Sequence, residues 1–358
     1  MASMPTVYDV AAAAGVSTAT VSRYFRDPDR VSPSTRTSIA EVVQSLGYVP
    51  SGLARGLAER QTGSIGLYSF GDHEADEYVQ PSPAPGAGVE EIDERNERVR
   101  LFPLFADEVL RGVELECTIG KTPLTVGWQG LDGGGIALDD LARRVDGLIL
   151  LPHVMSRETL QLLARTRPMV MVSEAAIPGL PVGSVTVDNR AGVGALVRHL
   201  IVAHGHRTFE FVGRPTVALD YRERRQGFED ALTEAGISVP EVTRVGDSGR
   251  TGTRDAFLHR LRERPLPDAF VCASDQTALG VIEAMQAQGI RVPTDVAVTG
   301  FDGIVAGRLC TPSLTTVRQP METLGRTAVR LLSEQMAGEG ARHLTLPVQL
   351  AVRRSCGC

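Results

Sequence analysis

A chain of 358 residues, 42% of them hydrophobic, has room for a small module and a large α/β domain with its own core. A formal net charge of −6 does not by itself indicate a nucleic-acid partner, and five scattered cysteines argue against a disulfide framework. No N-terminal apolar run resembles a secretory signal and no stretch approaches the ~20 apolar residues that span a bilayer, so we expect a cytosolic protein.

The chain opens with two short predicted helices joined by a turn. Gly15 ends a run of apolar residues at helical spacing, and Ser17 can cap a second helix that begins at Thr18. On that helix Val21 is expected to face inward, which leaves four residues facing outward: Thr18, Ala19, Ser22 and Arg23. A helix-turn-helix reads DNA bases from such positions. An ordinary pair of packed helices is the alternative interpretation.

A third helix is predicted between Ser32-Pro33, an N-cap followed by proline at the first helical position, and Gly47. Its apolar stripe consists of Ile39, Val42, Val43 and Leu46. Three helices would therefore close a small unit. Residues 48–60 follow, a short stretch with two glycines that would be only marginally helical alone.

From Ser64 onward, apolar runs alternate with amphipathic stretches, the pattern of parallel sheets covered by helices. In the first half we predict strands at 65–70, 125–128, 147–152, 169–172 and 185–187, and a helix at 104–117. In the second half we predict strands at 209–213, 269–273 and 296–300, and helices at 222–234 and 276–288. Two such halves would leave a cleft at the carboxyl ends of their strands.

The sequence resembles the LacI family of bacterial transcriptional regulators over nearly its whole length. The matching N-terminal segments are 6–11, 15–17, 20–23, 47–50, 54–57 and 62–66. The later ones are 187–189, 205–207, 224–228, 274–280, 300–302, 312–320 and 352–355. So many matches at fixed spacing favour the helix-turn-helix over a plain helical pair.

The resemblance implies an all-α helix-turn-helix DNA-binding domain at 1–48, a hinge helix at 49–61, and an α/β periplasmic-binding-protein-like effector and dimerisation domain at 62–358. The large domain would have two lobes, one of 62–188 with 317–346 and one of 189–316 with 347–358. Residues 71–100 depart from the family pattern, because they hold nine acids, three arginines and few core residues. This composition is typical of a flexible surface insertion. A lid or a contact with a partner is the alternative.

The resemblance places DNA contacts in the helix-turn-helix and in the hinge. Groove-facing positions are Thr18, Ala19 and Arg23, and an arginine on guanine contributes about 1–3 kcal/mol of discrimination. Phosphate contacts are expected from Tyr8, Ser17 and Ser22. In the family, the hinge helix orders on operator DNA and wedges a leucine into the minor groove. Leu57 matches that leucine, with Ala54 and Arg55 beside it.

The resemblance also implies an effector site, formed by Leu104, Phe105, Ser173, Arg224, Ser274 and Asp302. An arginine fork can hold a carboxylate, a phosphate or a pair of hydroxyls, and Asp302 can accept hydrogen bonds from two sugar hydroxyls. A structural ion pair between Arg224 and Asp302 is the alternative. Trp128 is expected in the core. A sugar or sugar derivative is the effector that the family implies.

An enzyme is the main rival class, but the sequence has no G-x-S-x-G, no H-E-x-x-H and no paired-cysteine metal spacing. His199, His204 and His206 follow a helix and fit its C-terminal dipole, and Cys356 and Cys358 are only two thiols on a tail. We therefore expect no metal site and no cofactor. The second rival is a sugar-binding transport or sensor protein without DNA activity, which residues 6–60 argue against.

These observations lead us to expect a transcriptional repressor that acts as a homodimer on a pseudo-palindromic operator. A small molecule, by default a carbohydrate, would bias the angle between the lobes and so decide whether the paired hinges order on DNA. The protein would be cytoplasmic, nucleoid-associated when bound to DNA, and without a membrane partner.

Overall fold

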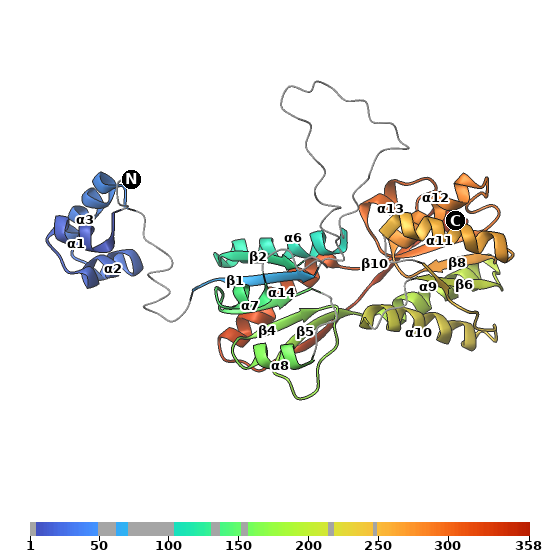
Figure 1. Ribbon diagram of the computed structural model, residues 1–358, viewed down its shortest axis with the longest axis horizontal. Coiled ribbons are helices and arrows are strands. Elements are labelled where there is room, and N and C mark those ends of the chain that lie inside the picture. The colour runs from blue at the N-terminus through green and yellow to red at the C-terminus, as the bar shows by residue number, and fades with distance from the viewer. Residues whose placement is uncertain are drawn as a thin grey trace, which may run out of the picture. The chain divides into compact units, whose positions relative to one another are not determined.

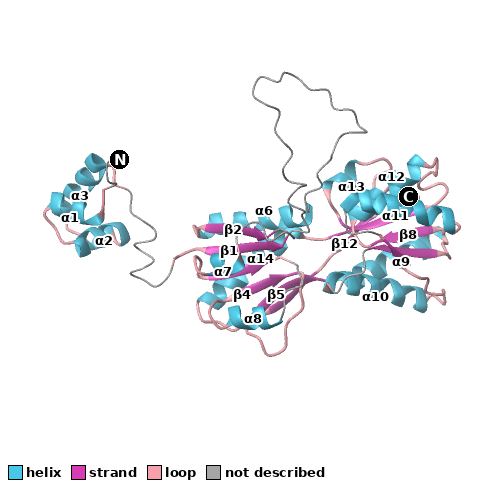
Figure 2. Cartoon of the chain, in the orientation of Figure 1, coloured by secondary structure: helices cyan, strands magenta, loops and turns pink. Residues whose placement is uncertain are grey.

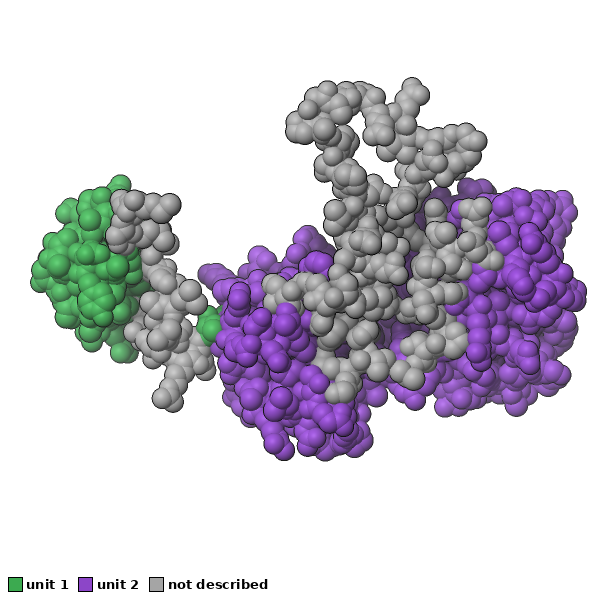
Figure 3. Space-filling model, viewed as in Figure 1, with its two compact units in different colours: residues 1–63 green, residues 64–358 purple. Residues whose placement is uncertain are grey.

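The chain divides into two compact units, residues 1–63 and 64–358 (Figure 3). The computed structural model describes residues 5–48, 62–70, 104–129, 137–151, 157–213, 218–245 and 249–358. The predicted hinge at 49–61 and the predicted insertion at 71–100 lie outside the described residues. Each unit has a hydrophobic core of its own.

The first unit is a three-helix domain. Its elements are α1 (Val7–Ala14), α2 (Thr18–Arg26), the short 3-10 helix η1 (Pro28–Arg30) and α3 (Pro33–Leu46). Thr6 caps α1 in a capping box with Asp9, and Ser17 caps α2 by accepting the Thr20 N–H at 3.1 Å. The beginning of α2 at its Ser17 cap confirms the prediction, whereas the Thr6 cap of α1 was not predicted.

Three helices enclose the core of the first unit, whose fully buried residues include Val10, Val21 and Ile39. The prediction that Val21 faces inward is confirmed. The predicted place of Leu46 in the apolar stripe was wrong, because this side chain is 38% exposed. Leu46 is the last residue of α3, and packing against the other helices is concentrated around Ile39.

The second unit contains two six-stranded sheets, and we call the sheet of β1 with its helices the first lobe. Its strand order is β11-β5-β4-β3-β1-β2, with every neighbouring pair parallel. The strands are β1 (Ile65–Phe70), β2 (Leu124–Gln129), β3 (Gly147–Leu150), β4 (Met169–Val172), β5 (Val182–Val187) and β11 (His343–Leu346). The helices are α6 (Leu104–Gly120), α7 (Leu138–Ala142), α8 (Arg157–Ala164) and α14 (Met321–Met336).

The second lobe has strand order β12-β10-β9-β8-β6-β7, and β12 alone runs antiparallel to its neighbour. Its strands are β6 (Phe209–Gly213), β7 (Thr243–Arg244), β8 (Ala269–Cys272), β9 (Ala297–Asp302), β10 (Thr315–Arg318) and β12 (Gln349–Ala351). Its helices are α9 (Asn189–His204), α10 (Leu219–Glu234), α11 (Gly249–Glu263), α12 (Asp275–Ala287), α13 (Val305–Leu309) and the 3-10 helix η2 (Arg354–Cys356).

In both lobes the strands lie between helices (Figures 1 and 2), which confirms the predicted class of parallel sheets covered by helices. The chain passes between the lobes after β5, after β10 and after β11. Trp128 was expected in the core and is instead 43% exposed, because β2 is an edge strand. Within the described ranges, no helix combines the length and apolar composition that a membrane span requires.

Glycines allow the closest helix contact in the first lobe, where α14 packs on α6. A Cβ at Gly325 would lie 2.1 Å from the backbone oxygen of Val109, and one at Gly112 would lie 2.0 Å from that of Glu322. No real side chain occupies such a space, and backbone atoms cannot rotate away. These two glycines therefore set the distance between the helices.

We expect Gly325→Ala to destabilise the large unit by about 1–3 kcal/mol or more, because the added methyl group forces α14 away from α6. Gly340→Ala is the matched control, since a Cβ there meets nothing within 4 Å. Urea denaturation followed by circular dichroism gives both values. Equal midpoints for the two variants would contradict the proposed role of Gly325.

Candidate functional site

The predicted DNA-contact residues of the helix-turn-helix lie on the first unit, and their side chains are exposed or half-buried there. Ala19 and Arg23 are exposed on α2, Thr18 and Ser22 are half-buried on the same helix, and Tyr8 is 73% exposed on α1. The nearby Arg30 and Arg36 form ion pairs with Asp27 and Asp29.

Ser17 is exposed at the beginning of α2, but its hydroxyl already accepts the Thr20 N–H and contacts the Thr20 hydroxyl at 2.9 Å. Its first role is therefore that of a cap. The hinge residues Ala54, Arg55 and Leu57 lie outside the described residues.

A buried polar cluster lies where strands of the second lobe end, and we call Asn189, Arg224, Asp302 and Gln319 the strand-end cluster. All four side chains are less than a tenth exposed. Arg224 of α10 donates to Asn189 Oδ1 at 2.9 Å and to the Ala273 carbonyl at 2.8 Å. Its guanidinium lies 3.8 Å from the centre of the Phe301 ring. Two neutral acceptors and one aromatic face therefore hold this arginine in place.

Two carboxylates flank the guanidinium at longer range. Asp302 Oδ1 and Asp220 Oδ2 each lie 3.5 Å from a terminal nitrogen of Arg224. Asp302 also accepts a hydrogen bond from Gln319 Nε2 at 2.7 Å. Burial raises the pKa of Asp302, while Arg224 and Gln319 oppose that rise. The predicted residues Arg224 and Asp302 are thus brought together, as a loose pair.

Gln319 is a residue that the sequence reasoning did not assign to the site, although it falls in the matching segment 312–320. Its Nε2 donates a hydrogen bond to Asp302, but its buried Oε1 has no hydrogen-bond partner among the residues that the structure describes. A buried acceptor without a partner costs about 1–3 kcal/mol, which a ligand hydroxyl would recover. Asp302 itself has φ 124°, a conformation that is strained for any residue with a side chain.

The remaining predicted effector residues have varied surroundings. Ser173 is buried at the end of β4 with φ 58°, and Phe105 is half-buried against the large core. Ser274 caps α12 by accepting the Thr277 N–H at 3.2 Å. Leu104 begins α6, and its side chain lies outside the described residues. Among the predicted residues whose side chains the structure describes, Arg224 and Asp302 are the two that pair directly.

Glu174, next to Ser173, connects the electrostatics of the two lobes. Burial and the Asp220 carboxylate raise the pKa of Glu174 to about 7, while Arg222 lowers it. Glu174 follows β4 of the first lobe, whereas Asp220 and Arg222 belong to α10 of the second. Sequence reasoning did not assign Glu174 to the site, although it directly follows the predicted residue Ser173.

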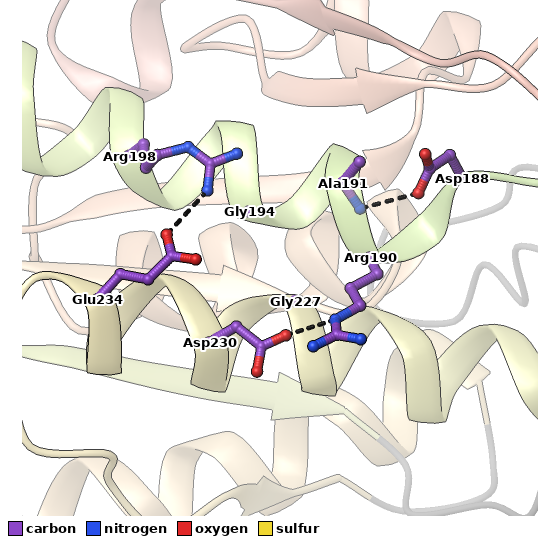
Figure 4. Close-up of a pocket in the computed structure, with 8 residues that line it drawn as sticks. All are labelled: Asp188, Arg190, Ala191, Gly194, Arg198, Gly227, Asp230 and Glu234. Carbon is purple, nitrogen blue, oxygen red and sulfur yellow. Dashed lines mark hydrogen bonds and ion pairs between the residues drawn. The ribbon is translucent and has the colours of Figure 1, made fainter.

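A depression of about 280 Å³ lies between α9 and α10 (Figure 4). Arg190 and Arg198 of α9 reach across it to Asp230 and Glu234 of α10, at 2.5 and 3.4 Å. These charges neutralise one another, and Gly194 and Gly227 line the same depression. Its opposite charges already pair with one another, so the strand-end cluster remains the better candidate.

Comparison with known proteins agrees with this geometry. Residues 6–51 match the lacI family of bacterial regulatory proteins, and residues 197–356 match a periplasmic binding protein-like domain. The transcriptional regulator CelR of Thermobifida fusca is 32% identical over 371 residues, with 98% of both chains covered. The chain belongs to the LacI family. Catabolite control protein A of Priestia megaterium is 31% identical over 358 residues, again with 98% of both chains covered.

Solved LacI-type structures share the fold. A lac repressor dimer bound to operator and to an anti-inducer superimposes with a TM-score of 0.79 at 24% identity, covering 99% of each chain. A complex of CelR with cellobiose gives a TM-score of 0.66 at 28% identity, covering 98% of this chain and 99% of that one. As a LacI-family member, the chain is a DNA-binding transcriptional regulator and not an enzyme, as predicted.

The raised pKa of Glu174 makes the stability of the large unit depend on pH. Between its ordinary value of 4.5 and about 7, the folded protein keeps a proton that the unfolded chain has lost, so stability falls as pH rises. We expect Glu174→Gln to be more stable than the wild type by about 1–2 kcal/mol near pH 8, after allowing for partial exposure, and equal to it near pH 4.

Urea denaturation at several pH values measures this difference. Glu339→Gln, which changes an exposed glutamate beyond α14, serves as the control and should show no such pH dependence. If the free energies of unfolding of Glu174→Gln and the wild type differ by the same amount at every pH, the raised pKa of Glu174 is ruled out.

Proposed function

We propose that the protein is a repressor that binds a pseudo-palindromic operator as a homodimer and is controlled by a neutral carbohydrate at the strand-end cluster. The observation that carries the effector assignment is the buried pair of Arg224 and Asp302, together with the unpartnered Oε1 of Gln319. Arginine donors, carboxylate acceptors and an amide are the groups that recognise sugar hydroxyls. The relative CelR, solved with cellobiose, supports the same ligand class.

The charge around the cluster favours a neutral ligand over an anionic one. Arg224 is flanked by Asp220 and Asp302, and Glu174 and Arg222 add one charge of each sign. With all three carboxyls ionised the two arginines are outnumbered, and with one carboxyl protonated the charges balance, so no net positive charge is left for a phosphate or a carboxylate. A phosphosugar would therefore meet repulsion that a neutral sugar avoids.

Control of DNA binding follows from the position of the cluster at the passages between lobes. Asn189 begins α9 directly after β5, and Gln319 directly follows β10. A ligand that engages either residue acts on a segment that connects the lobes, and so biases the angle between them. The lobe angle would in turn set whether the two hinges of a dimer can order on operator DNA.

For DNA, we expect Arg23→Ala to weaken specific operator binding by about 1–3 kcal/mol, the value of one arginine–guanine contact. The operator is first selected from a random duplex library with purified protein, and affinities are then measured by fluorescence anisotropy at constant salt. Arg30→Ala removes the same charge from an exposed arginine of the same unit and is the matched control. If Arg23→Ala weakens binding to the selected operator no more than binding to random duplex, as expected for Arg30→Ala, then Arg23 does not read a base.

For the effector, we expect Asp302→Asn to abolish the rise in melting temperature that a bound neutral sugar produces, because the amide replaces a charged acceptor. Cellobiose and other neutral oligosaccharides are the probes, and glucose 6-phosphate is the anionic comparison. Operator affinity without sugar should stay at the wild-type level. Asp295→Asn, an acid of the same lobe paired with Arg291, is the control. A sugar response that survives Asp302→Asn would remove Asp302 from the site.

A further inference from the structure

Four metal-ligating side chains meet at the far end of α9, outside the site described above. They are His199, His204, Cys356 and Cys358, and their ligand atoms all lie within 4.8 Å of one another. Two belong to the last turns of α9, and two to the C-terminal segment. From the sequence we expected the histidines to serve the helix dipole and the thiols to be too few for a metal. The fold instead brings both pairs to one point.

The C-terminal segment is held firmly in this position. Antiparallel pairing of β12 with β10 returns the chain to the second lobe, and η2 follows. Ser355 Oγ donates to the Val298 carbonyl at 2.5 Å and accepts the Thr315 N–H at 2.8 Å. The Thr315 hydroxyl in turn donates to Cys356 Sγ at 3.1 Å. These hydrogen bonds therefore fix the position of the Cys356 thiol.

Gly357 lets both cysteines face the histidines. Its φ is 105°, a backbone conformation that side chains rarely permit, and a Cβ here would already lie 3.4 Å from His204 Nδ1. With glycine at this position the chain reverses tightly, so that Cys356 and Cys358 both approach His199.

The distances match those of a tetrahedral metal site. Cys356 Sγ and Cys358 Sγ lie 3.8 and 3.7 Å from His199 Nε2, and Cys358 Sγ lies 3.3 Å from His204 Nε2. A tetrahedral zinc ion with Zn–S near 2.3 Å and Zn–N near 2.0–2.1 Å separates its sulfur and nitrogen ligands by about 3.6 Å. The measured values lie on both sides of this distance, so an ion fits with small movements.

We propose that His199, His204, Cys356 and Cys358 form a structural zinc site that joins the C-terminus to α9. Two thiolates and two neutral imidazoles are a donor set that zinc prefers, and the two negative charges balance the charge of the ion. The ring of His206 stacks on that of His204, with centroids 5.5 Å apart, and supports its orientation.

The test uses the full-length protein, purified under reducing conditions, stripped with a chelator and titrated with Zn²⁺ or Co²⁺. We expect about one zinc ion per chain by mass spectrometry of metals, and cobalt spectra with thiolate charge-transfer and tetrahedral ligand-field bands. Zinc should raise the melting temperature of the wild type by linkage. Cys358→Ser and His204→Ala should weaken zinc binding by more than about a hundredfold and abolish that rise.

Two control variants match the substitutions in kind. Cys310→Ser removes a thiol, and His259→Ala an imidazole, outside the cluster, and both should bind zinc like the wild type. Cys358 is exposed, so Cys358→Ser should fold normally, which circular dichroism of the metal-free protein verifies. Substoichiometric zinc in the reduced wild type would overturn the proposal. So would zinc binding that survives Cys358→Ser, or a Cys356–Cys358 disulfide that persists in reductant.

Discussion

The carboxylate of Asp275 is the constraint on which the arrangement of the second lobe depends. It is fully buried, and it accepts the Gly303 and Ile304 N–H groups at 2.8 and 2.9 Å and the Thr316 hydroxyl at 2.5 Å. These bonds join the beginning of α12 to the turn after β9 and to β10. A buried carboxylate without such partners would be very costly, so the three segments are held together. Asp302 and Gln319 are placed by the same segments, which explains how Asp302 keeps its strained backbone.

The geometry around Arg224 bears on the choice between the proposed binding site and a structural ion pair. The neutral acceptors Asn189 and Ala273 lie at hydrogen-bonding distance from the guanidinium, whereas both flanking carboxylates lie at 3.5 Å. The arginine is thus positioned without relying on the acids. A ligand hydroxyl that inserts between guanidinium and carboxylate replaces a weak contact with two good hydrogen bonds, which is the preorganisation that a binding site requires.

Much of this fold is predictable from the sequence, because its elements carry strong local signals. The strands 65–70, 169–172 and 209–213 were predicted with the bounds that the structure shows, and Ser17 marks the beginning of α2. The errors have a different origin. Trp128 is exposed because β2 lies at the edge of its sheet, and local periodicity does not reveal the order of the strands. The predicted strand at 185–187 was also too short, since β5 begins at Val182. The roles of Gln319 and of the terminal cysteines depend on contacts between residues far apart in the chain, which no local pattern contains.

Two carboxyl groups from different lobes influence each other beside the proposed effector site. Glu174 of the first lobe and Asp220 of the second each carry a carboxyl group, and the pKa of Glu174 is raised first by burial and then by the Asp220 carboxylate. A ligand that separates or neutralises Glu174 and Asp220 would change the angle between the lobes. By linkage, that angle would change the affinity for the ligand. A ligand hydroxyl donated to either carboxylate lowers the repulsion between them in the closed arrangement only. Because Asp220 also flanks Arg224, one ligand can relieve the repulsion and occupy the arginine at the same time.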